Sequence, residues 1–292
     1  MEELIRANKR RSLLLVVAVV ALLALMGAAW GAFGGTPLGG LVAGMLLGGV
    51  AGIWAFQQSD QSVLRAAGAR PVTRTEDAFL FHTAGGLALA AGIPAPKMYI
   101  VEDSAPNAFA TGRDPEHATI CVTRGLVDKL ERLELEGVVA HEMAHIRNYD
   151  IRYLSMVAVL VGTVVFAADL LRHRVFWRPA RGRRGGGQGA LMILVVVAAV
   201  AAPLLAVLLR AAVSRQREYL ADASGAELTR YPEGLAAALE KITADTEPLE
   251  VANRGTAHLY VVNPLLEYRG RATDWFSTHP PTDERIRRLR SM

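Results

Sequence analysis

The stretch His141-Glu142-Met143-Ala144-His145 decides how this chain of 292 residues is interpreted. In a helix, residues i and i+4 lie on the same face, so the two imidazoles can bind one metal ion while the Glu142 carboxylate stands beside it. Two histidines and a carboxylate at this spacing are typical of a zinc hydrolase. The stretch therefore predicts a helix that carries a catalytic metal site.

A catalytic zinc ion usually has three protein ligands and an open position for water, so the two histidines require a third ligand. Glu218 is the candidate, because Asp222 follows it one helical turn later on the same helix face. An acidic pair at this spacing is also typical of a solvated helix face. Beside the histidines, however, it supplies a ligand and a carboxylate that can orient a ligating imidazole. Zinc lowers the pKa of its bound water to about 7, and Glu142 can then take the proton and pass it to a leaving amine. The sequence predicts peptide hydrolysis at one zinc ion per chain.

Hydrophobic residues make up 52% of the chain and charged residues 21%, an apolar excess that is rare in soluble globular domains. Two uncharged, almost wholly apolar segments, residues 13–29 and 37–56, are each long enough to cross a bilayer as a helix. A cleaved signal peptide is the competing interpretation of the first segment, but its apolar core is longer than usual and a second span follows at once. We therefore expect an amino-terminal transmembrane hairpin within residues 1–58.

The charges that flank the hairpin indicate its orientation. Cations precede the first span and follow the second, which places both ends in the cytoplasm: Arg6, Lys9, Arg10 and Arg11, then Arg65, Arg70 and Arg74. The single cysteine, Cys121, can form no intrachain disulfide and is expected in the core. The net charge of +4 comes largely from arginines beside apolar segments, which favours contact with anionic lipids. No basic patch interleaved with aromatic residues suggests a nucleic-acid partner.

Beyond the hairpin, the residue patterns predict an α+β fold that is mainly helical with a small sheet, expected to be antiparallel. Short strands are expected over residues 97–101 and 118–122, on either side of 107–112. Thr123 can cap a short helix, and the next helix, residues 133–149, carries the two histidines. Further helices are expected over the ranges 75–91, 215–228 and 232–242.

These features together resemble the gluzincin metalloproteases, and more closely the HtpX-type membrane proteases and their relatives, the CAAX prenyl proteases. The resemblance spans nearly the whole chain, including the hairpin. Its motifs are the histidine helix, Glu218 with Asp222, Asn107-Ala108-Phe109-Ala110-Thr111-Gly112, and His279-Pro280-Pro281 followed by Arg285. It implies a zinc protease domain over residues 59–292, interrupted by a membrane-associated helix pair within 153–209.

The resemblance also implies roles for individual residues. The implied zinc ligands are His141, His145 and Glu218, the general base and acid is Glu142, and the carboxylate that orients His141 is Asp222. Asn107 and Ala108 would lie on an edge strand, whose unpaired backbone groups can bind an extended substrate peptide. Taken by itself, Asn107 equally fits a turn. Either His279 or Arg285 would stabilise the oxyanion, or the His-Pro-Pro stretch simply begins the last helix.

Two later apolar segments, residues 153–168 and 190–209, lie between His145 and Glu218. Since zinc ligands converge to about 2 Å from one ion, the chain must enter and leave the membrane on the same side, by two crossings or none. Two crossings would place the intervening arginines outside the cytoplasm, against the usual charge bias, so a re-entrant hairpin stays open beside full spanning. If the helix carrying His145 continues straight into the membrane, the zinc ion lies roughly 12 to 14 Å from its surface.

The predicted activity is that of an ATP-independent, zinc-dependent endopeptidase in the cell membrane. Its expected partners are the lipid bilayer and unfolded or damaged membrane proteins, cleaved at the cytoplasmic face in a protein quality-control role. One alternative is a CAAX-type prenyl-protein protease, although four apolar segments are few to enclose a lipid chain. Another is a catalytically idle, zinc-stabilised scaffold, whose sequence would lack the equivalent of Glu142. The sequence indicates no oligomeric state.

Overall fold

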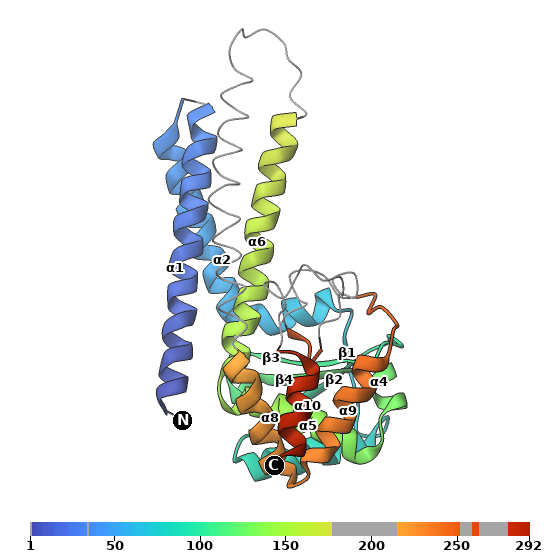
Figure 1. Ribbon diagram of the computed structural model, residues 1–292. Helices are drawn as coiled ribbons and strands as arrows, with labels where there is room; N and C mark the ends of the chain where they lie inside the picture. Colours follow the sequence, from blue (N-terminus) through green and yellow to red (C-terminus); the bar gives the residue numbers. More distant parts are fainter. Residues whose placement is uncertain (1, 34, 177–214, 252–258, 263–279) are drawn as a thin grey trace.

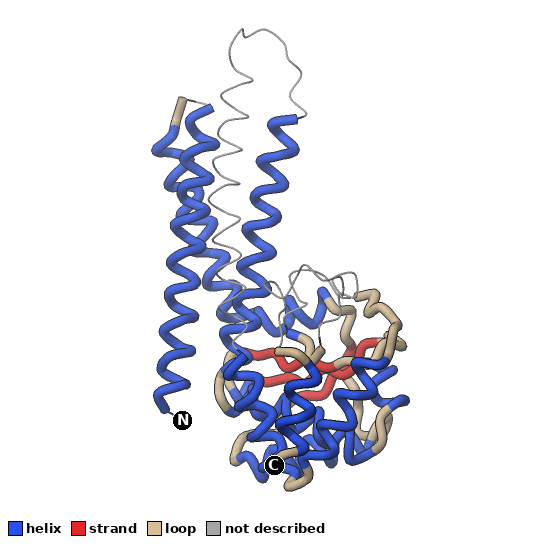
Figure 2. Tube along the Cα trace, in the orientation of Figure 1, coloured by secondary structure: helices blue, strands red, loops and turns tan. Residues whose placement is uncertain are grey.

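The computed structural model describes residues 2–33, 35–176, 215–251, 259–262 and 280–292 (Figure 1). Three long helices form one end of the molecule, namely α1 (Glu2–Phe33), α2 (Pro37–Ala66) and α6 (Asp150–Phe176). They extend away from a globular part in which shorter helices surround a small sheet (Figure 2). The amino-terminal end of α1 lies at the level of the globular part, whereas α1 and α2 meet at the far end.

The first two helices have the length and composition predicted for the membrane hairpin. Both are apolar enough to cross a bilayer, over Arg6–Gly31 and Pro37–Ala66. They approach each other through glycines, since a Cβ atom at Gly40 would lie 2.1 Å from the carbonyl oxygen of Gly27. On the outside of the pair, large apolar side chains such as Leu38, at 73% exposure, suit hydrocarbon better than water.

The sheet has four strands in the order β1-β2-β4-β3: β1 (Arg70–Pro71), β2 (Lys97–Val101), β4 (Ala118–Thr123) and β3 (Ala108–Gly112). Strand β1 is antiparallel to β2, and β3 is antiparallel to β4, but β2 and β4 are parallel. The expectation of an antiparallel sheet is thus corrected to a mixed sheet. The reason is that the chain passes from β2 to the edge strand β3 before β4 returns between the two.

Side chains alternate between the two faces of the sheet, and each face is covered. On one face, Ile100, Ala110 and Ile120 belong to a core that includes the middle of α5 (Arg132–Arg147). On the other face, Phe109 and Cys121 belong to a second core, shared with α1, α2 and α6. The sheet therefore joins the globular part to the long helices, and the cysteine is buried and free as expected.

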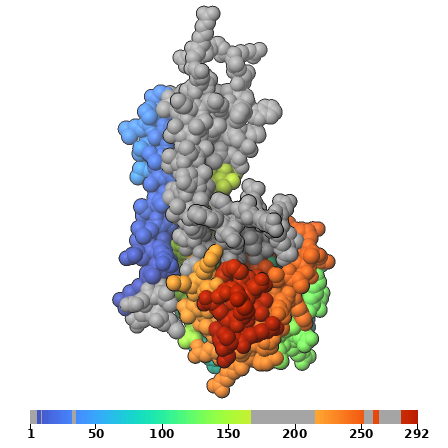
Figure 3. All heavy atoms as spheres, viewed as in Figure 1, coloured from blue at the N-terminus to red at the C-terminus, as the bar shows by residue number. Residues whose placement is uncertain are grey.

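Helix α5 lies at the centre of the globular part, and most of its residues are buried. Its first turn is fixed by a reciprocal cap, in which the Glu131 N–H donates to the Glu134 carboxylate at 2.7 Å. The predicted cap at Thr123 is confirmed, since its hydroxyl accepts from the Leu126 N–H at 3.2 Å. The remaining elements are α3 (Ala78–Ala91), η1 (Pro115–His117), α4 (Arg124–Lys129), α8 (Arg215–Thr229), α9 (Pro232–Ala244) and α10 (Thr282–Arg290). Figure 3 shows α10 at the surface between α8 and α9.

Helices α5 and α6 do not form one straight helix, because the chain bends by 85° between them. The bend contains Tyr149, whose φ of 59° is left-handed and unusual for a residue other than glycine. The straight-line estimate of the distance between the metal site and the membrane is therefore wrong. Residues 153–168 fall within α6, which packs along α1, whereas residues 190–209 lie outside the described part of the chain.

Candidate metal centre

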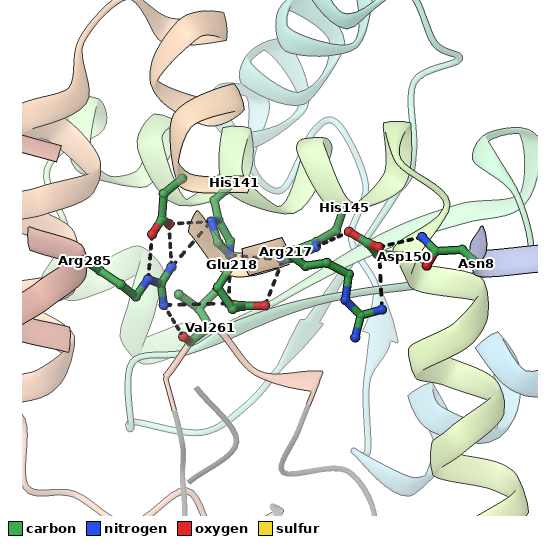
Figure 4. Close-up of polar contacts among 9 residues, drawn as sticks. Asn8, His141, His145, Asp150, Arg217, Glu218, Val261 and Arg285 are labelled. Atoms are coloured by element: carbon green, nitrogen blue, oxygen red, sulfur yellow. Dashed lines mark hydrogen bonds and ion pairs between the residues drawn. The ribbon is translucent and has the colours of Figure 1, made fainter. Parts of the chain in front are cut away.

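The two histidines of α5 point toward Glu218, which α8 brings from a distant part of the sequence (Figure 4). All three side chains are buried, with His141 at 1%, His145 at 6% and Glu218 at 7% exposure. The two helices can approach because α8 carries Gly225 at the crossing. A Cβ atom there would lie only 3.1 Å from the His141 backbone nitrogen. The sequence-distant acid thus reaches the histidines through close helix packing.

The three side chains offer ligand atoms at distances that suit one metal ion. The two histidine Nε2 atoms are 3.2 Å apart, and they lie 3.6 and 3.8 Å from the Glu218 carboxylate oxygens. Ligands placed tetrahedrally at about 2.1 Å from an ion are about 3.4 Å from each other. Among the described residues, this is the group of His, Cys, Asp and Glu side chains whose ligand atoms converge, and the donor set is one that zinc favours.

The outer ring nitrogen of each histidine is held by a carboxylate. His141 Nδ1 lies 2.9 Å from an oxygen of Asp222, and His145 Nδ1 lies 3.1 Å from an oxygen of Asp150. An imidazole that donates from Nδ1 presents the Nε2 lone pair to a metal. The sequence predicted the contact of Asp222 with His141 but not the contact of Asp150 with His145. The one feature of the sequence that points to Asp150 is its position five residues after His145.

Arg285 lies against Asp222 and within 4.0 Å of the Glu218 carboxylate. Its guanidinium donates twice to the Asp222 carboxylate, at 2.9 and 2.7 Å, and once to the Val261 carbonyl at 2.9 Å. Although burial alone would raise the pKa of Asp222, the charges of Arg285 and the hydrogen bond with His141 lower it to about 2. Arg285 therefore keeps Asp222 ionised at neutral pH.

Glu142 is 2% exposed and lines the same small cavity as the three candidate ligands. Burial raises its pKa to about 7. Burial lowers the pKa of His141, which favours the neutral, metal-binding form. Burial also opposes the charge on His145, but the hydrogen bond to Asp150 and the charge of Glu218 outweigh it and raise its pKa to about 9.

Ala108 begins the edge strand β3 and Asn107 directly precedes it but, contrary to what the resemblance had led us to expect, their backbone groups are not all unpaired. The chain's own residues 259–262 pair with them there. The Ala108 carbonyl accepts from the Val261 N–H at 3.0 Å, and the Asn107 amide donates to the Val262 carbonyl at 2.9 Å. Further along the strand, Ala110 lines the cavity beside the histidines. His279 lies outside the described residues.

Comparison with known proteins gives one consistent family. The sequence model of Peptidase family M48 matches residues 76–292. A protease HtpX homolog of Dictyoglomus thermophilum is 46% identical over 290 residues, covering 99% of this chain and 94% of the relative. One from Listeria innocua is 43% identical over 302 residues and covers 99% of each chain.

The fold has a counterpart among solved structures, the crystal structure of S. mikatae Ste24p. The likeness has a TM-score of 0.52 at 19% identity and covers 99% of this chain and 66% of that chain. It supports the mainly helical fold with its small sheet, and the sequence relatives confirm the resemblance to HtpX-type proteases. On these matches the chain belongs to peptidase family M48 and is a membrane metalloprotease.

Proposed function

We propose that this protein is a zinc-dependent endopeptidase that hydrolyses unfolded or damaged membrane proteins at the cytoplasmic face of the cell membrane. One observation carries the proposal. One ligand atom from each of three buried side chains lies within 4.8 Å of the other two, and a fourth buried group, the Glu142 carboxylate, lines the same cavity. A protein that used zinc only as a structural support would have no need of this carboxylate.

The ligands proposed for zinc are His141, His145 and Glu218. When bound, the ion would polarise the scissile carbonyl and lower the pKa of an attacking water molecule. Glu142 accepts the proton of that water and returns it to the leaving amine, as a general base and then a general acid. A carboxyl pKa of about 7 suits this exchange, because near neutral pH the group both accepts and releases a proton readily.

The substrate is proposed to lie along β3 as an extended strand. An edge strand binds a peptide through its backbone groups, which suits a protease that must accept many sequences. Asn107 and Ala108 hold residues 259–262 at the start of the strand. The stretch toward Ala110, which lines the cavity, leads the substrate past the metal site. His279 is the proposed oxyanion donor, because the contacts of Arg285 commit that side chain to Asp222.

The arrangement of the helices supports a cytoplasmic site. The amino-terminal end of α1 lies at the same end of the molecule as the metal centre (Figure 1), and cations flank the hairpin at that end. By the positive-inside rule this end is cytoplasmic. Membrane-proximal loops of poorly folded proteins would then come within reach. The domain boundaries, a hairpin over residues 1–58 and a protease domain over 59–292, form part of the proposal.

The test compares cleavage by matched variants of the full chain. The protein is purified in detergent with a chelator, zinc is restored, and cleavage of an unfolded protein is followed for the native chain, Glu142→Gln and Glu136→Gln. Glu136 belongs to the same helix but does not line the cavity, so its variant controls for loss of a carboxylate. We expect cleavage by the native chain and Glu136→Gln only. Equal cleavage by Glu142→Gln would refute the mechanism, and zinc binding without cleavage in the native chain would favour the scaffold.

Two further substrates separate the remaining possibilities. A membrane-tethered version of the unfolded chain should be cleaved faster than its soluble version, because both the tether and the active site lie at the bilayer. Equal rates would count against membrane proteins as the substrates. Cleavage of a prenylated CAAX peptide in preference to both would favour the prenyl-protein protease.

A further inference from the structure

The second carboxylate of the metal centre, Asp150, belongs to the membrane helix α6 rather than to the helices that carry the ligands. Its side chain is 2% exposed, and one oxygen lies 3.1 Å from His145 Nδ1. The other oxygen accepts from the side-chain amide of Asn8 at 2.8 Å and lies 3.8 Å from the guanidinium of Arg217 in α8 (Figure 4). Asp150 therefore joins a candidate ligand to a residue of the first membrane helix, 142 residues away in sequence.

The bend between α5 and α6 creates the contact between Asp150 and His145. In a continuous helix, a residue five positions later lies about 140° around the axis and about 7.5 Å along it, out of reach of the imidazole. Here the chain turns through the left-handed Tyr149, and α6 begins at Asp150 with its carboxylate directed back at His145. The strained backbone at Tyr149 thus serves to place this carboxylate.

Asn8 holds both sides of this turn. Besides its bond to Asp150, its amide donates to the Asn148 carbonyl at 3.2 Å. Asn8 is 4% exposed, and a buried amide is costly unless its groups are paired. It lies among the charged residues that precede the apolar stretch of the helix, which begins at Leu13. It lies before residue 76, where the match to Peptidase family M48 begins. A membrane anchor alone needs no amide at this position.

We propose that Asp150 and Asn8 are positioning residues of the metal centre: Asp150 fixes the ring of His145, and Asn8 fixes Asp150, so the first membrane helix completes the support of the ligand set. This inference rests on the ligands named in the proposed function. The centre is then held from two sides. Asp222 and Arg285 support His141 from within the globular part, and Asp150 and Asn8 support His145 from the long helices.

The test measures zinc affinity in the full chain, purified in detergent, by competition with a chelating dye. Loss of a carboxylate that orders a ligating histidine typically weakens metal binding 10- to 100-fold. We expect a loss of this size in Asp150→Asn and a smaller, several-fold loss in Asn8→Leu, which keeps the branched shape of the side chain but removes its hydrogen-bonding groups. Ser12→Ala is the matched control, because Ser12 is also a buried polar residue of α1 but donates only to the Asn8 carbonyl.

Three measurements distinguish positioning from general support of the fold. The thermal midpoints of the zinc-free variants should remain close to that of the native chain while their zinc affinities differ. The double variant should bind zinc as weakly as Asp150→Asn alone, since Asn8 acts through Asp150. The visible spectrum of bound Co²⁺ should shift in Asp150→Asn and stay unchanged in Ser12→Ala. Native affinity in Asp150→Asn, or additive losses in the double variant, would overturn the proposal.

His145→Ala separates this inference from the proposed function. If this variant still binds one zinc ion with native affinity, the ligand set itself is wrong. If it loses zinc while Asp150→Asn and Asn8→Leu bind as tightly as the native chain, the ligand set stands and the positioning role fails.

Discussion

The buried ion pair of Asp222 and Arg285 should contribute measurably to stability as well as to the metal centre. The Arg285 side chain is 1% exposed and the Asp222 side chain 3%, and two hydrogen bonds join them. Asp222→Ala removes both of these hydrogen bonds and leaves the guanidinium buried, with the Glu218 carboxylate at 4.0 Å as its remaining ion pair. Breaking a buried pair in this way costs about 3 to 5 kcal/mol.

The pKa of Asp222 gives a second estimate. A fall from 3.8 to about 2 corresponds to about 2 kcal/mol of stability at neutral pH. Because the pKa is lower in the folded state, this stability is fully present above pH 3.8 and is lost as the pH falls toward 2. The value is below that for Asp222→Ala because protonation keeps the side chain in place, whereas the substitution also removes its packing.

The assay is thermal unfolding of the zinc-free protein in detergent for Asp222→Ala, Arg285→Met and the double variant. A loss of about 4 kcal/mol lowers the midpoint of a chain this size by roughly 10 °C. The double variant should lose little more than either single one, because it leaves no unpaired charge behind. Arg287→Met, on the exposed face of the same helix, is the control and should change the midpoint by no more than 1 or 2 °C. Additive losses in the double variant would refute the reasoning.

Three further predictions concern pH, metal and the hairpin. Activity should fall as the pH is lowered, because protonation removes Glu142 as a base. The midpoint of this fall should lie between about pH 4.5 and about 7, since burial raises the pKa of Glu142 to about 7 and a bound cation lowers it again. A midpoint below pH 4.5 in the profile of rate against pH would contradict this. Removal of zinc by a chelator should lower the thermal midpoint of the native chain, because a free zinc concentration of about 1,000 times the dissociation constant stabilises the folded state by about 4.1 kcal/mol. In His145→Ala the chelator should not change the midpoint, and an equal drop in that variant would show that zinc binds at another site. Gly40→Leu should prevent close packing of α1 against α2 and reduce the yield of folded protein, measured by gel filtration. Gly49→Leu is the control and should not reduce the yield, because a Cβ atom there meets nothing within 4 Å. Equal yields of the two variants would argue against the helix contact.

Much of the fold follows from local patterns in the sequence. Three features match their expected positions: the hairpin, the strand at Lys97–Val101 and the cap at Thr123. Each follows from a pattern in neighbouring residues, namely the length of the apolar segments, the alternation of apolar and polar residues, and a side chain that can cap a helix. The metal site was also predictable in part. Helical spacing places His141 and His145 on one face, and the Glu218-Asp222 spacing gives a matching face on the second helix.

The rest depends on contacts that no local pattern encodes. The parallel pairing of β2 and β4 arises from the order in which the chain visits the sheet, and alternation is the same for parallel and antiparallel neighbours. The support of His145 depends on a left-handed backbone at Tyr149, a conformation that the residue type disfavours. Its last member, Asn8, comes from a helix that the sequence presents only as a membrane anchor.

The residues that support His141 and those that support His145 belong to different parts of the molecule. The hairpin therefore has a second role besides anchoring the protein, because it helps to position His145. Asp222 and Arg285 lie within residues 76–292, so packing inside the globular part can order His141. The support of His145 needs α6 to start at the bend and α1 to lie alongside it, and the apolar core shared by α1 and α6 is what keeps these helices together. A movement of α1 relative to α6 would therefore displace the His145 ring, through the hydrogen bond from Asn8 to Asp150 and the one between Asp150 and His145. A chain that lacked the hairpin would keep its three ligands and its general base, but Asp150 would lose the hydrogen bond from Asn8 and keep only the longer contact with Arg217, at 3.8 Å.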